Sequence, residues 1–534
     1  MCPRIVTNTT SEPCRPLATC VARCRGVRRI VHWLKLLLRE QAPDEQFSHC
    51  PAWLTLTRKL EFNIKLKEKK MERKNCWKEY SEKRLEKMEH YAKDYMHFLN
   101  KAKTERECCD TVVNMVEKEG FVDLAKLIKE QKKIKEGDKV YATWMNKAVI
   151  LMHIGKESME RGMNMIVSHI DSPRIDVKPN PLYENEGVAY LDTHYYGGIK
   201  KYQWVTIPLA IHGVVIKKDG TTVEVCLGED KDEPVVFISD LLPHIASEQM
   251  EKTAEKLFSG EALDVVIGNR PLKEKDKEEN SAEPVKAKIM QLLQECYDME
   301  EEDFLSAELE IVPAGKAREA GLDRSMIMAY GHDDKVCAYA AVHALLHAKN
   351  PSKTSVVMLA DKEEIGSYGA TGMTSRFFEN MIAEAMYLHG EESDIAFRRA
   401  MSSSNLLSAD VSSVYDPMFA DAFEKKNAAL LGGGLVFNKV TGARGKSGAN
   451  DANAEYLAKL RMILEEKDVV YQFAEYGRID LGGSGTVSHI LAEYAMNVVD
   501  CGTAVMNMHA PFEVTSKIDA FETMRGYKAF LENA

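Results

Sequence analysis

The sequence lacks a long apolar run. No stretch of its 534 residues approaches the roughly 18 to 20 consecutive apolar residues that span a bilayer. Its glycine clusters at 432–434 and 482–485 lack both a following Lys-Ser/Thr and the spacing of a nucleotide-binding fingerprint. We therefore expect a soluble protein without a membrane partner, whose glycines serve close backbone approach and not phosphate binding.

Acidic residues outnumber basic residues after residue 70. Residues 1–70 hold 14 Lys and Arg against 6 Asp and Glu, which leaves 57 against 76, a net charge of −19, for residues 71–534. Nucleic-acid binding needs clustered Lys and Arg to contact phosphates. The acidic composition therefore argues against a nucleic-acid partner.

The cysteines do not form a disulfide pattern. Five of the 12 lie in the first 70 residues and the others are dispersed. Cys20 and Cys24 have the spacing of half a zinc knuckle, but no matching second pair follows. A dispersed set is typical of free thiols in a reducing compartment, so we expect a cytoplasmic protein.

Residues 1–70 differ from the rest of the chain. A transit peptide would be richer in Ser, and the apolar segment 31–38 is too short and too interrupted by charge for a signal peptide. A third interpretation is that Met71 is the natural start and that the extension is a gene-model artefact. We favour the third, because composition changes at Met71 and the organised patterns follow it.

The body begins with helical and strand patterns. Apolar residues at three- and four-residue spacing predict helices over 77–132. Residues 139–154 and 162–171 are expected to be strands, and the second is nearly continuous in apolar residues, as a strand buried on both faces should be.

Residues 180–327 have a different texture. Short β-rich runs at 204–209 and 214–216, with a turn at 217–220, predict hairpins and not βαβ units. Alternating helix and strand patterns return over 328–534. We therefore expect an α/β domain interrupted by an inserted β-rich domain, with at least two cores.

Two adjacent carboxylates stand where an apolar strand is expected to end. The mostly apolar run 354–360 leads into Asp361, Lys362, Glu363 and Glu364. Burying one unpaired carboxylate is costly, so two together imply a metal, a cationic substrate group or a shifted pKa. We favour a metal.

Other apolar runs also end in residues that bind metals. Three of them lead into His169 with Asp171, into Asp410 and into His509, while Asp333 directly precedes a helical pattern. In open α/β sheets, ligands gather beyond the carboxyl ends of the strands. We therefore expect these segments to share one crevice.

These donors suit two divalent cations bridged by one carboxylate. Zinc accepts imidazole nitrogen and carboxylate oxygen, an oxygen-rich set also suits manganese or cobalt, and the sequence leaves the choice open. Asp171 points the same way as His169 along an extended strand and can orient its imidazole. Because Glu363 and Glu364 cannot both face one point, we expect one to bind metal and the other to transfer protons, which predicts hydrolysis.

Together the motifs resemble the aspartyl aminopeptidase and aminopeptidase I family of dinuclear zinc metallopeptidases. The resemblance covers residues 71–534 and is carried by HIDSPR (169–174), DDK (333–335), DKEEIGS (361–367), SAD (408–410) and MH (508–509). It implies a zinc-peptidase-like α/β/α sandwich formed by 71–179 and 328–534, with an inserted β-rich dimerisation domain, 180–327. It also implies a homo-oligomer in which dimers assemble into a dodecamer.

The resemblance also assigns metal ligands. By resemblance, Asp333 would bridge the two ions. His169 and Asp410 would complete one metal site, and Glu364 and His509 would complete the other.

Further roles follow from the same resemblance. Glu363 would be the general base that removes the N-terminal residue of peptide substrates, and Asp171 would orient His169. His244 is similar to a histidine that reaches a neighbouring subunit's site, and Lys439 to a basic residue that contacts substrate. The segment after the metal-binding aspartate lacks the His-rich stretch of eukaryotic aspartyl aminopeptidases and resembles the bacterial branch, so a preference for acidic substrates does not follow.

Two other functions stay open. One is a dinuclear metal amidohydrolase that acts on N-acyl amino acids or other small amides, which a strict need for a free α-amino group would rule out. The other is a non-catalytic assembly protein with this fold. The intact set of expected ligands argues against the second.

Overall fold

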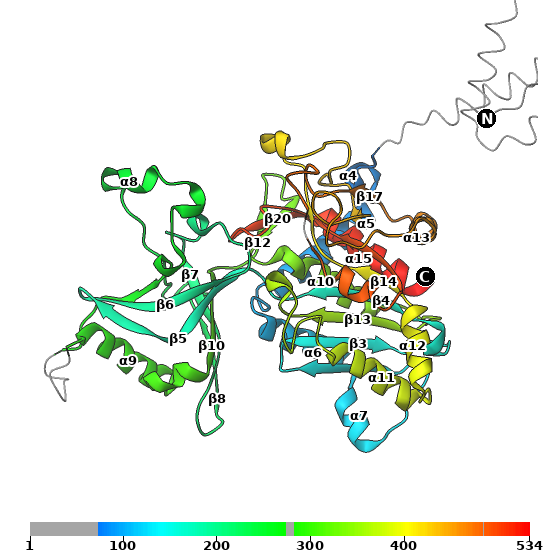
Figure 1. Cartoon of the computed structure of the whole chain (residues 1–534), viewed down its shortest axis with the longest axis horizontal. Helices are drawn as coiled ribbons and strands as arrows, with labels where there is room; N and C mark the ends of the chain where they lie inside the picture. The colour runs from blue at the N-terminus through cyan, green and yellow to red at the C-terminus, as the bar shows by residue number, and fades with distance from the viewer. Residues whose placement is uncertain (1–72, 274–281, 484) are drawn as a thin grey trace, which may run out of the picture. The chain divides into compact units, whose positions relative to one another are not determined.

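A nine-stranded sheet is the scaffold of the larger part of the fold (Figure 1). The structure, a computed structural model, describes residues 73–273, 282–483 and 485–534, so the extension 1–70 lies outside the described residues. The strands of this sheet, in spatial order, are β1 (Val122–Asp123), β2 (Lys139–Trp144), β3 (Ala148–His153), β13 (Ser355–Ala360), β4 (Asn164–His169), β14 (Asn405–Ser408), β18 (Asn497–Gly502), β16 (Leu435–Asn438) and β17 (Tyr471–Ala474). Because β13, β4, β14 and β18 run parallel, their carboxyl ends share one edge.

Helices pack on both faces of this sheet. One hydrophobic core holds Val357 and Leu359 of β13, and the other holds Val356 and Met358. Successive side chains of a strand point to opposite faces, so this strand is buried on both sides. The first core is formed with α5 (Glu82–Leu99), α6 (Glu105–Lys118), α10 (His332–His347), α13 (Ala454–Glu466) and α15 (Lys517–Asn533), and the second with α7 (Leu124–Glu130), α11 (Phe377–His389), α12 (Asp394–Ser402) and α14 (Ser488–Ala492). The expected α/β/α layering is confirmed.

A six-stranded antiparallel sheet has its own hydrophobic core. In spatial order its strands are β8 (Thr222–Leu227), β7 (Leu209–Ile216), β10 (Ala307–Pro313), β5 (Arg174–Asn185), β6 (Val188–Tyr196) and β9 (Val265–Gly268). Helix α9 (Pro284–Tyr297) packs on β5 and β6, and the short α8 (Ser247–Met250) lies between β8 and β9 in the chain. The expected β-rich segment is therefore present, although its sheet begins at Arg174 and not at residue 180.

One expected strand in this region is wrong. The turn at 217–220 does join β7 to β8, but of the run 204–209 only Leu209 belongs to a strand. Thr206 has a left-handed backbone (φ 63°), and Pro208 has no N–H to donate to a ladder. The β-branched and apolar composition of the run reflects burial of Trp204 and not pairing.

A five-stranded sheet closes the fold near the site. Its order is β11 (Arg318–Ala320), β12 (Met326–Ala329), β20 (Glu513–Ser516), β19 (Ala504–Met506) and β15 (Ser412–Ser413).

The expected helical region 77–132 is divided into α4 (Cys76–Glu79), α5, α6 and α7. Helix α6 starts at a capping box, in which the Thr104 side chain accepts from Glu107 N and the Glu107 side chain accepts from Thr104 N.

A buried ion pair joins the six-stranded sheet to α6. His212 of β7 contacts Glu107 through Nδ1 at 2.7 Å and Glu229 through Nε2 at 3.1 Å. Burial opposes its charge, but hydrogen bonds with Cys226, Glu107 and Glu229 raise the pKa of His212 to about 11. Both ring nitrogens of His212 therefore contact carboxylates that come from different parts of the chain.

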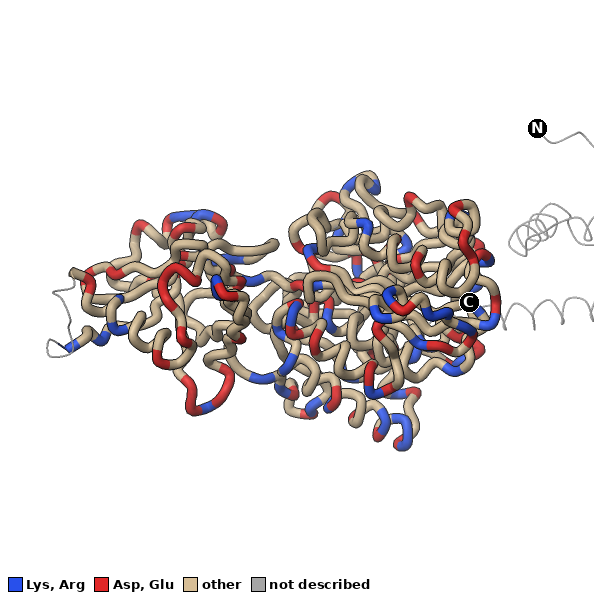
Figure 2. The backbone as a smooth tube through the Cα atoms, turned by 90° about the horizontal axis from the view of Figure 1, so that it is seen from below, with Lys and Arg blue, Asp and Glu red and all other residues tan. Residues whose placement is uncertain are grey.

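The described cysteines are free thiols, and Cys226 and Cys296 are the exposed ones among them. Each helix that the structure describes is too short or too polar to cross a membrane. In the view of Figure 2, Lys and Arg are scattered among Asp and Glu along the chain.

Candidate metal centre

Strand ends bring most of the predicted ligands together. His169 is the last residue of β4, and Asp410 follows β14 closely. Glu363 and Glu364 begin the 3₁₀ helix η9 (Glu363–Ile365) just beyond β13. The last residues of β4 and β13 are paired in the parallel ladder, so these side chains start from adjacent positions.

Asp333 and His509 reach the same edge from outside the nine-stranded sheet. Asp333 lies in the first turn of α10, where its backbone is not helical (φ −79°, ψ 111°). His509 follows β19 of the five-stranded sheet in a left-handed conformation (φ 66°). The expected crevice is therefore formed by the ends of two sheets and the start of a helix.

Asp333 lies between the two imidazoles. Its Oδ1 is 3.1 Å from Nε2 of His169, and its Oδ2 is 3.3 Å from Nε2 of His509. The side chain is only 4% exposed. Each oxygen of one carboxylate thus faces a different histidine, as a carboxylate that bridges two ions requires.

Hydrogen bonds on the far side orient both rings. Nδ1 of His169 donates to the carbonyl oxygen of Asp171 at 3.0 Å, and Nδ1 of His509 donates to the carbonyl oxygen of Gly198 at 3.0 Å. A carbonyl oxygen can only accept, so each Nδ1 carries a proton. If a metal ion displaced the second proton of each ring, the Nε2 lone pair on the side of Asp333 would be free to bind that ion.

The spacing of these atoms fits ligands on a common ion. Two donors about 2.0–2.1 Å from a tetrahedral zinc are about 3.3 Å apart. Nε2 of His509 is 3.5 Å from Oε2 of Glu364, and Oε1 of Glu364 is buried without a hydrogen-bond partner in the described chain. Ligand atoms of Asp333, Asp334 and Asp410 also lie within 4.8 Å of one another. The donors therefore fit divalent metal ions.

Negative charge exceeds positive charge at this edge. Burial and neighbouring carboxylates raise the pKa of Glu363 to about 7 and the pKa values of Glu364 and Asp410 well above their usual range. Burial also opposes the charge of Asp333, but hydrogen bonds with the two imidazoles hold its pKa below the usual value. Divalent cations would balance this excess of carboxylates.

Two buried carboxylates that sequence reasoning missed support the centre. Glu513, the first residue of β20, accepts from Asp333 N at 2.9 Å through Oε2 and from His509 N at 2.8 Å through Oε1. Asp334 accepts from the Ser168 hydroxyl at 2.5 Å. Asp334 stands next to a predicted ligand, whereas nothing around Glu513 in the sequence distinguishes it from an ordinary strand residue.

Two glycines lie close to the expected ligands; Gly502 has no room for a side chain, and Gly198 has little. A Cβ on Gly502 would lie 2.0 Å from the carbonyl oxygen of Asp410, and one on Gly198 would lie 3.3 Å from Nδ1 of His509. The first contact is with backbone, so it cannot be relieved by rotating a side chain.

The centre opens into a cavity of about 330 Å³. Its lining includes Asp333, Glu363, Glu364, Asp410 and His509, together with Gly198, Gly366, Ser367, Tyr476, Gly485, Thr486, His489 and Met508. A larger hollow of about 910 Å³ lies among α5, α10 and α15 and shares no lining residue with this cavity. Expected metal ligands line the smaller cavity and not the larger one.

Two predicted substrate contacts lie outside this lining. His244 is exposed in the 3₁₀ helix η4 (Pro243–Ile245), and Lys439 is exposed directly after β16. In a single chain neither contributes to the cavity that the described residues form. Their roles stay predictions.

The chain is similar to known proteins in sequence and in fold. Residues 98–531 match the model of the aminopeptidase I zinc metalloprotease family, M18. A Clostridium acetobutylicum protein named "Probable M18 family aminopeptidase 1" is 53% identical over 462 residues, which are 86% of this chain and 98% of that protein.

Solved structures agree. The crystal structure of an M18 aminopeptidase from Thermotoga maritima is 42% identical, has a TM-score of 0.82, and is matched over 87% of this chain and 100% of its own. The S. cerevisiae mApe1 dodecamer, 19% identical with a TM-score of 0.66 over 82% of this chain and 95% of its own, shares the fold. The chain therefore belongs to the M18 family of aminopeptidase I zinc metalloproteases.

Proposed function

We propose that this chain removes the N-terminal residue from peptides by means of two divalent metal ions per subunit. Family membership supplies the reaction class, a metal-dependent peptide hydrolysis. The observation that carries the dinuclear assignment is that each oxygen of Asp333 faces the Nε2 atom of a different histidine.

We assign one ion to His169, Asp333 and Asp410 and the other to Asp333, Glu364 and His509. Zinc accepts this mixture of nitrogen and oxygen, and manganese or cobalt would accept the same set. When bound, the ions polarise the scissile carbonyl and lower the pKa of water. Asp171 holds His169 in the required tautomer.

Glu363 is the general base in this proposal. Both glutamates line the cavity, but the Glu363 side chain is 17% exposed against 4% for Glu364, so Glu363 is the more accessible of the two. Burial raises its pKa to about 7, which suits proton transfer near neutral pH. It takes a proton from the attacking water as the C–O bond forms and gives that proton to the leaving amine as the C–N bond breaks.

Substitution of Glu363 by Gln tests the assignment. We expect kcat on aminoacyl chromogenic amides to fall by about 10²–10⁴-fold, with the metal content of the protein unchanged. Undiminished turnover would rule out Glu363 as the base. Assays of the unaltered protein can also include N-acylated substrates, and a preference for these would instead favour an amidohydrolase. Inactivity of well-folded, metal-loaded protein on every substrate would favour an assembly protein.

We further propose that the inserted domain, residues 180–327, mediates dimerisation and that dimers assemble into a dodecamer. Near its His244, the side chains of Leu241 and Ile245 are 51% and 65% exposed, an apolar surface that a second copy would cover. In such an assembly His244 would reach a neighbour's cavity, and Lys439 would contact substrate. Mass photometry of Ile245→Glu should show smaller particles than the unaltered chain.

A further inference from the structure

The Asp171 carboxylate holds several parts of the centre at once. Its Oδ1 accepts from Glu363 N and its Oδ2 from Glu364 N, both at 3.2 Å. The same Oδ1 lies 3.3 Å from Nδ1 of His169. A shift of this one carboxylate would therefore move the proposed base and two proposed ligands together.

A residue of the six-stranded sheet holds Asp171 in turn. Tyr196 is the last residue of β6, and its hydroxyl donates to Oδ2 of Asp171 at 2.8 Å. The side chain is buried. Burial and the neighbouring Asp171 charge raise the pKa of Tyr196, so the hydroxyl keeps its proton and remains a donor.

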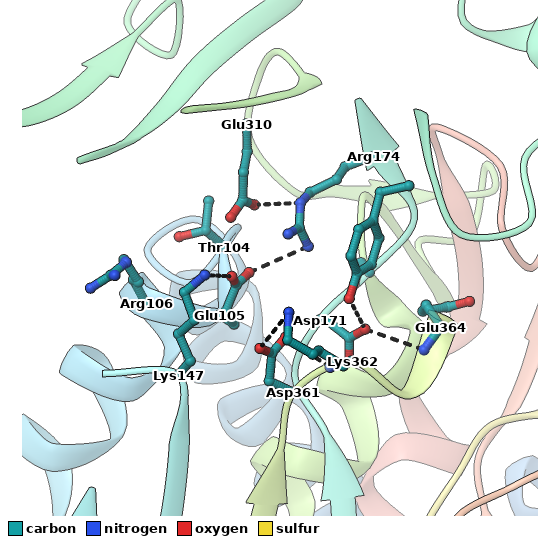
Figure 3. A network of polar contacts seen from close by, with 12 residues as sticks. Thr104, Glu105, Arg106, Lys147, Asp171, Arg174, Glu310, Asp361, Lys362 and Glu364 are labelled. Carbon is teal, nitrogen blue, oxygen red and sulfur yellow. Dashed lines mark hydrogen bonds and ion pairs between the residues drawn. The ribbon is translucent and has the colours of Figure 1, made fainter. Parts of the chain in front are cut away.

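The Tyr196 ring packs against Arg174, which belongs to a buried ionic network. The Arg174 guanidinium lies 3.9 Å from the centre of the ring. Arg174 contacts Asp176 at 2.8 Å, Glu310 at 3.1 Å and Glu105 at 3.4 Å. Figure 3 shows dashed lines from Arg174 to both Glu105 and Glu310.

These contacts come from separate parts of the chain. Glu105 is the first residue of α6, Glu310 lies in β10, and Arg174 and Asp176 lie in β5. The Arg174 guanidinium stacks on the Tyr196 ring and forms ion pairs with buried carboxylates, so its conformation is restricted. It is therefore a rigid support for the ring. The Tyr196 hydroxyl links this network to Asp171 through one hydrogen bond.

We propose that Tyr196 is a positioning residue of the metallopeptidase centre. Its hydroxyl holds the Asp171 carboxylate, which fixes the backbone of η9 and the ring of His169. The six-stranded sheet thereby completes the centre within one chain, in addition to any role in assembly. The inference rests on the ligand and base assignments of the proposed function.

The substitution Tyr196→Phe removes only this hydroxyl. Loss of a group that supports metal ligands typically costs 10–100-fold in metal affinity or activity, so we expect kcat to fall by about that factor and zinc affinity to weaken similarly. KM should change by no more than about twofold, because the hydroxyl does not face substrate. Zinc affinity is measured without substrate, by competition with a chromogenic chelator.

Tyr195→Phe is the matched control. Tyr195 is the preceding residue of the same strand and is 39% exposed, so its hydroxyl loss should leave kcat and zinc affinity unchanged. A purely structural role for Tyr196 would lower the melting temperature of Tyr196→Phe and leave kcat and zinc affinity at the control values. That result would overturn the proposal.

A double-mutant cycle with Asp171→Asn tests the route. If Tyr196 acts through Asp171, Tyr196→Phe should add little to the zinc-affinity loss that Asp171→Asn causes alone. Fully additive losses would contradict the proposal. If the unaltered protein hydrolyses no aminoacyl amide, the proposed function fails, while the chelator competition still decides whether Tyr196 positions the centre.

Discussion

Glu513 offers a sharp test of how the centre is held, because one carboxylate binds the backbone of two proposed ligands. Its oxygens accept from Asp333 N at 2.9 Å and from His509 N at 2.8 Å. Glu513→Gln keeps the size of the side chain but leaves only one acceptor oxygen. The amide NH₂ then meets one of the two N–H donors, which is left without a partner.

The expected magnitude follows from these two bonds. A hydrogen bond to a charged group contributes about 1.5–3 kcal/mol, and an unsatisfied buried donor costs about 1–3 kcal/mol. If displacement of this backbone segment weakens the free energy of zinc binding by about 2 kcal/mol, zinc affinity falls about 30-fold, since 1.4 kcal/mol corresponds to tenfold. That value lies within the 10–100-fold range typical of residues that support metal ligands.

The assay is equilibrium competition for zinc between the stripped protein and a chromogenic chelator. Glu522→Gln is the matched control: Glu522 is also fully buried and accepts from a backbone N–H, that of Val470 at 2.8 Å, but it does not line the cavity. We expect Glu522→Gln to lower stability and to retain zinc affinity within about twofold. Zinc binding by Glu513→Gln that equals the unaltered protein would refute the reasoning.

Two further predictions concern pH and packing. The folded-state pKa of His212, about 11, lies above its ordinary value of 6.5, so its stabilisation is complete below about pH 6.5 and is lost as pH rises through 11. The difference in free energy of unfolding between the unaltered protein and His212→Gln should therefore fall by up to about 1.4 kcal/mol per pH unit above neutrality. Gly502→Ala would place a Cβ 2.0 Å from the Asp410 carbonyl oxygen, so we expect kcat to fall more than about tenfold.

Each of these has its own contrary result. A stability gap for His212→Gln that stays constant from pH 6 to pH 10 would show that the imidazole is not charged by its carboxylate partners. For the glycine, Gly445→Ala is the control, since nothing lies within 4 Å of a Cβ there. Equal activity of the two alanine variants would mean that the Asp410 segment tolerates displacement.

That these segments converge could be predicted because the signal in each of them is local. His169 and the pair Glu363 and Glu364 end apolar runs, and charge at the end of a buried strand needs an explanation that a turn does not supply. The parallel ladder then aligns these ends. The family resemblance, which the comparison with M18 proteins confirms, rests on the same segments.

The supporting residues could not be predicted in this way. Glu513 and Tyr196 act through backbone groups and a carboxylate far away in the chain, and neither stands out from its neighbours by periodicity or spacing. Leu209 shows the converse, because the apolar run before it predicted a longer strand than Pro208 and the left-handed Thr206 allow. Tertiary contacts decided these cases.

In the proposed dinuclear site, Asp333 would be shared by two metal ions. Metal content after stripping, reloading with zinc and exhaustive dialysis tests it most directly, on the unaltered protein and on Asp333→Asn. We expect two zinc ions per chain in the unaltered protein, recovery of aminopeptidase activity on reloading, and loss of both tightly held ions in the variant. A single zinc ion per chain, or a variant that retains two, would contradict it.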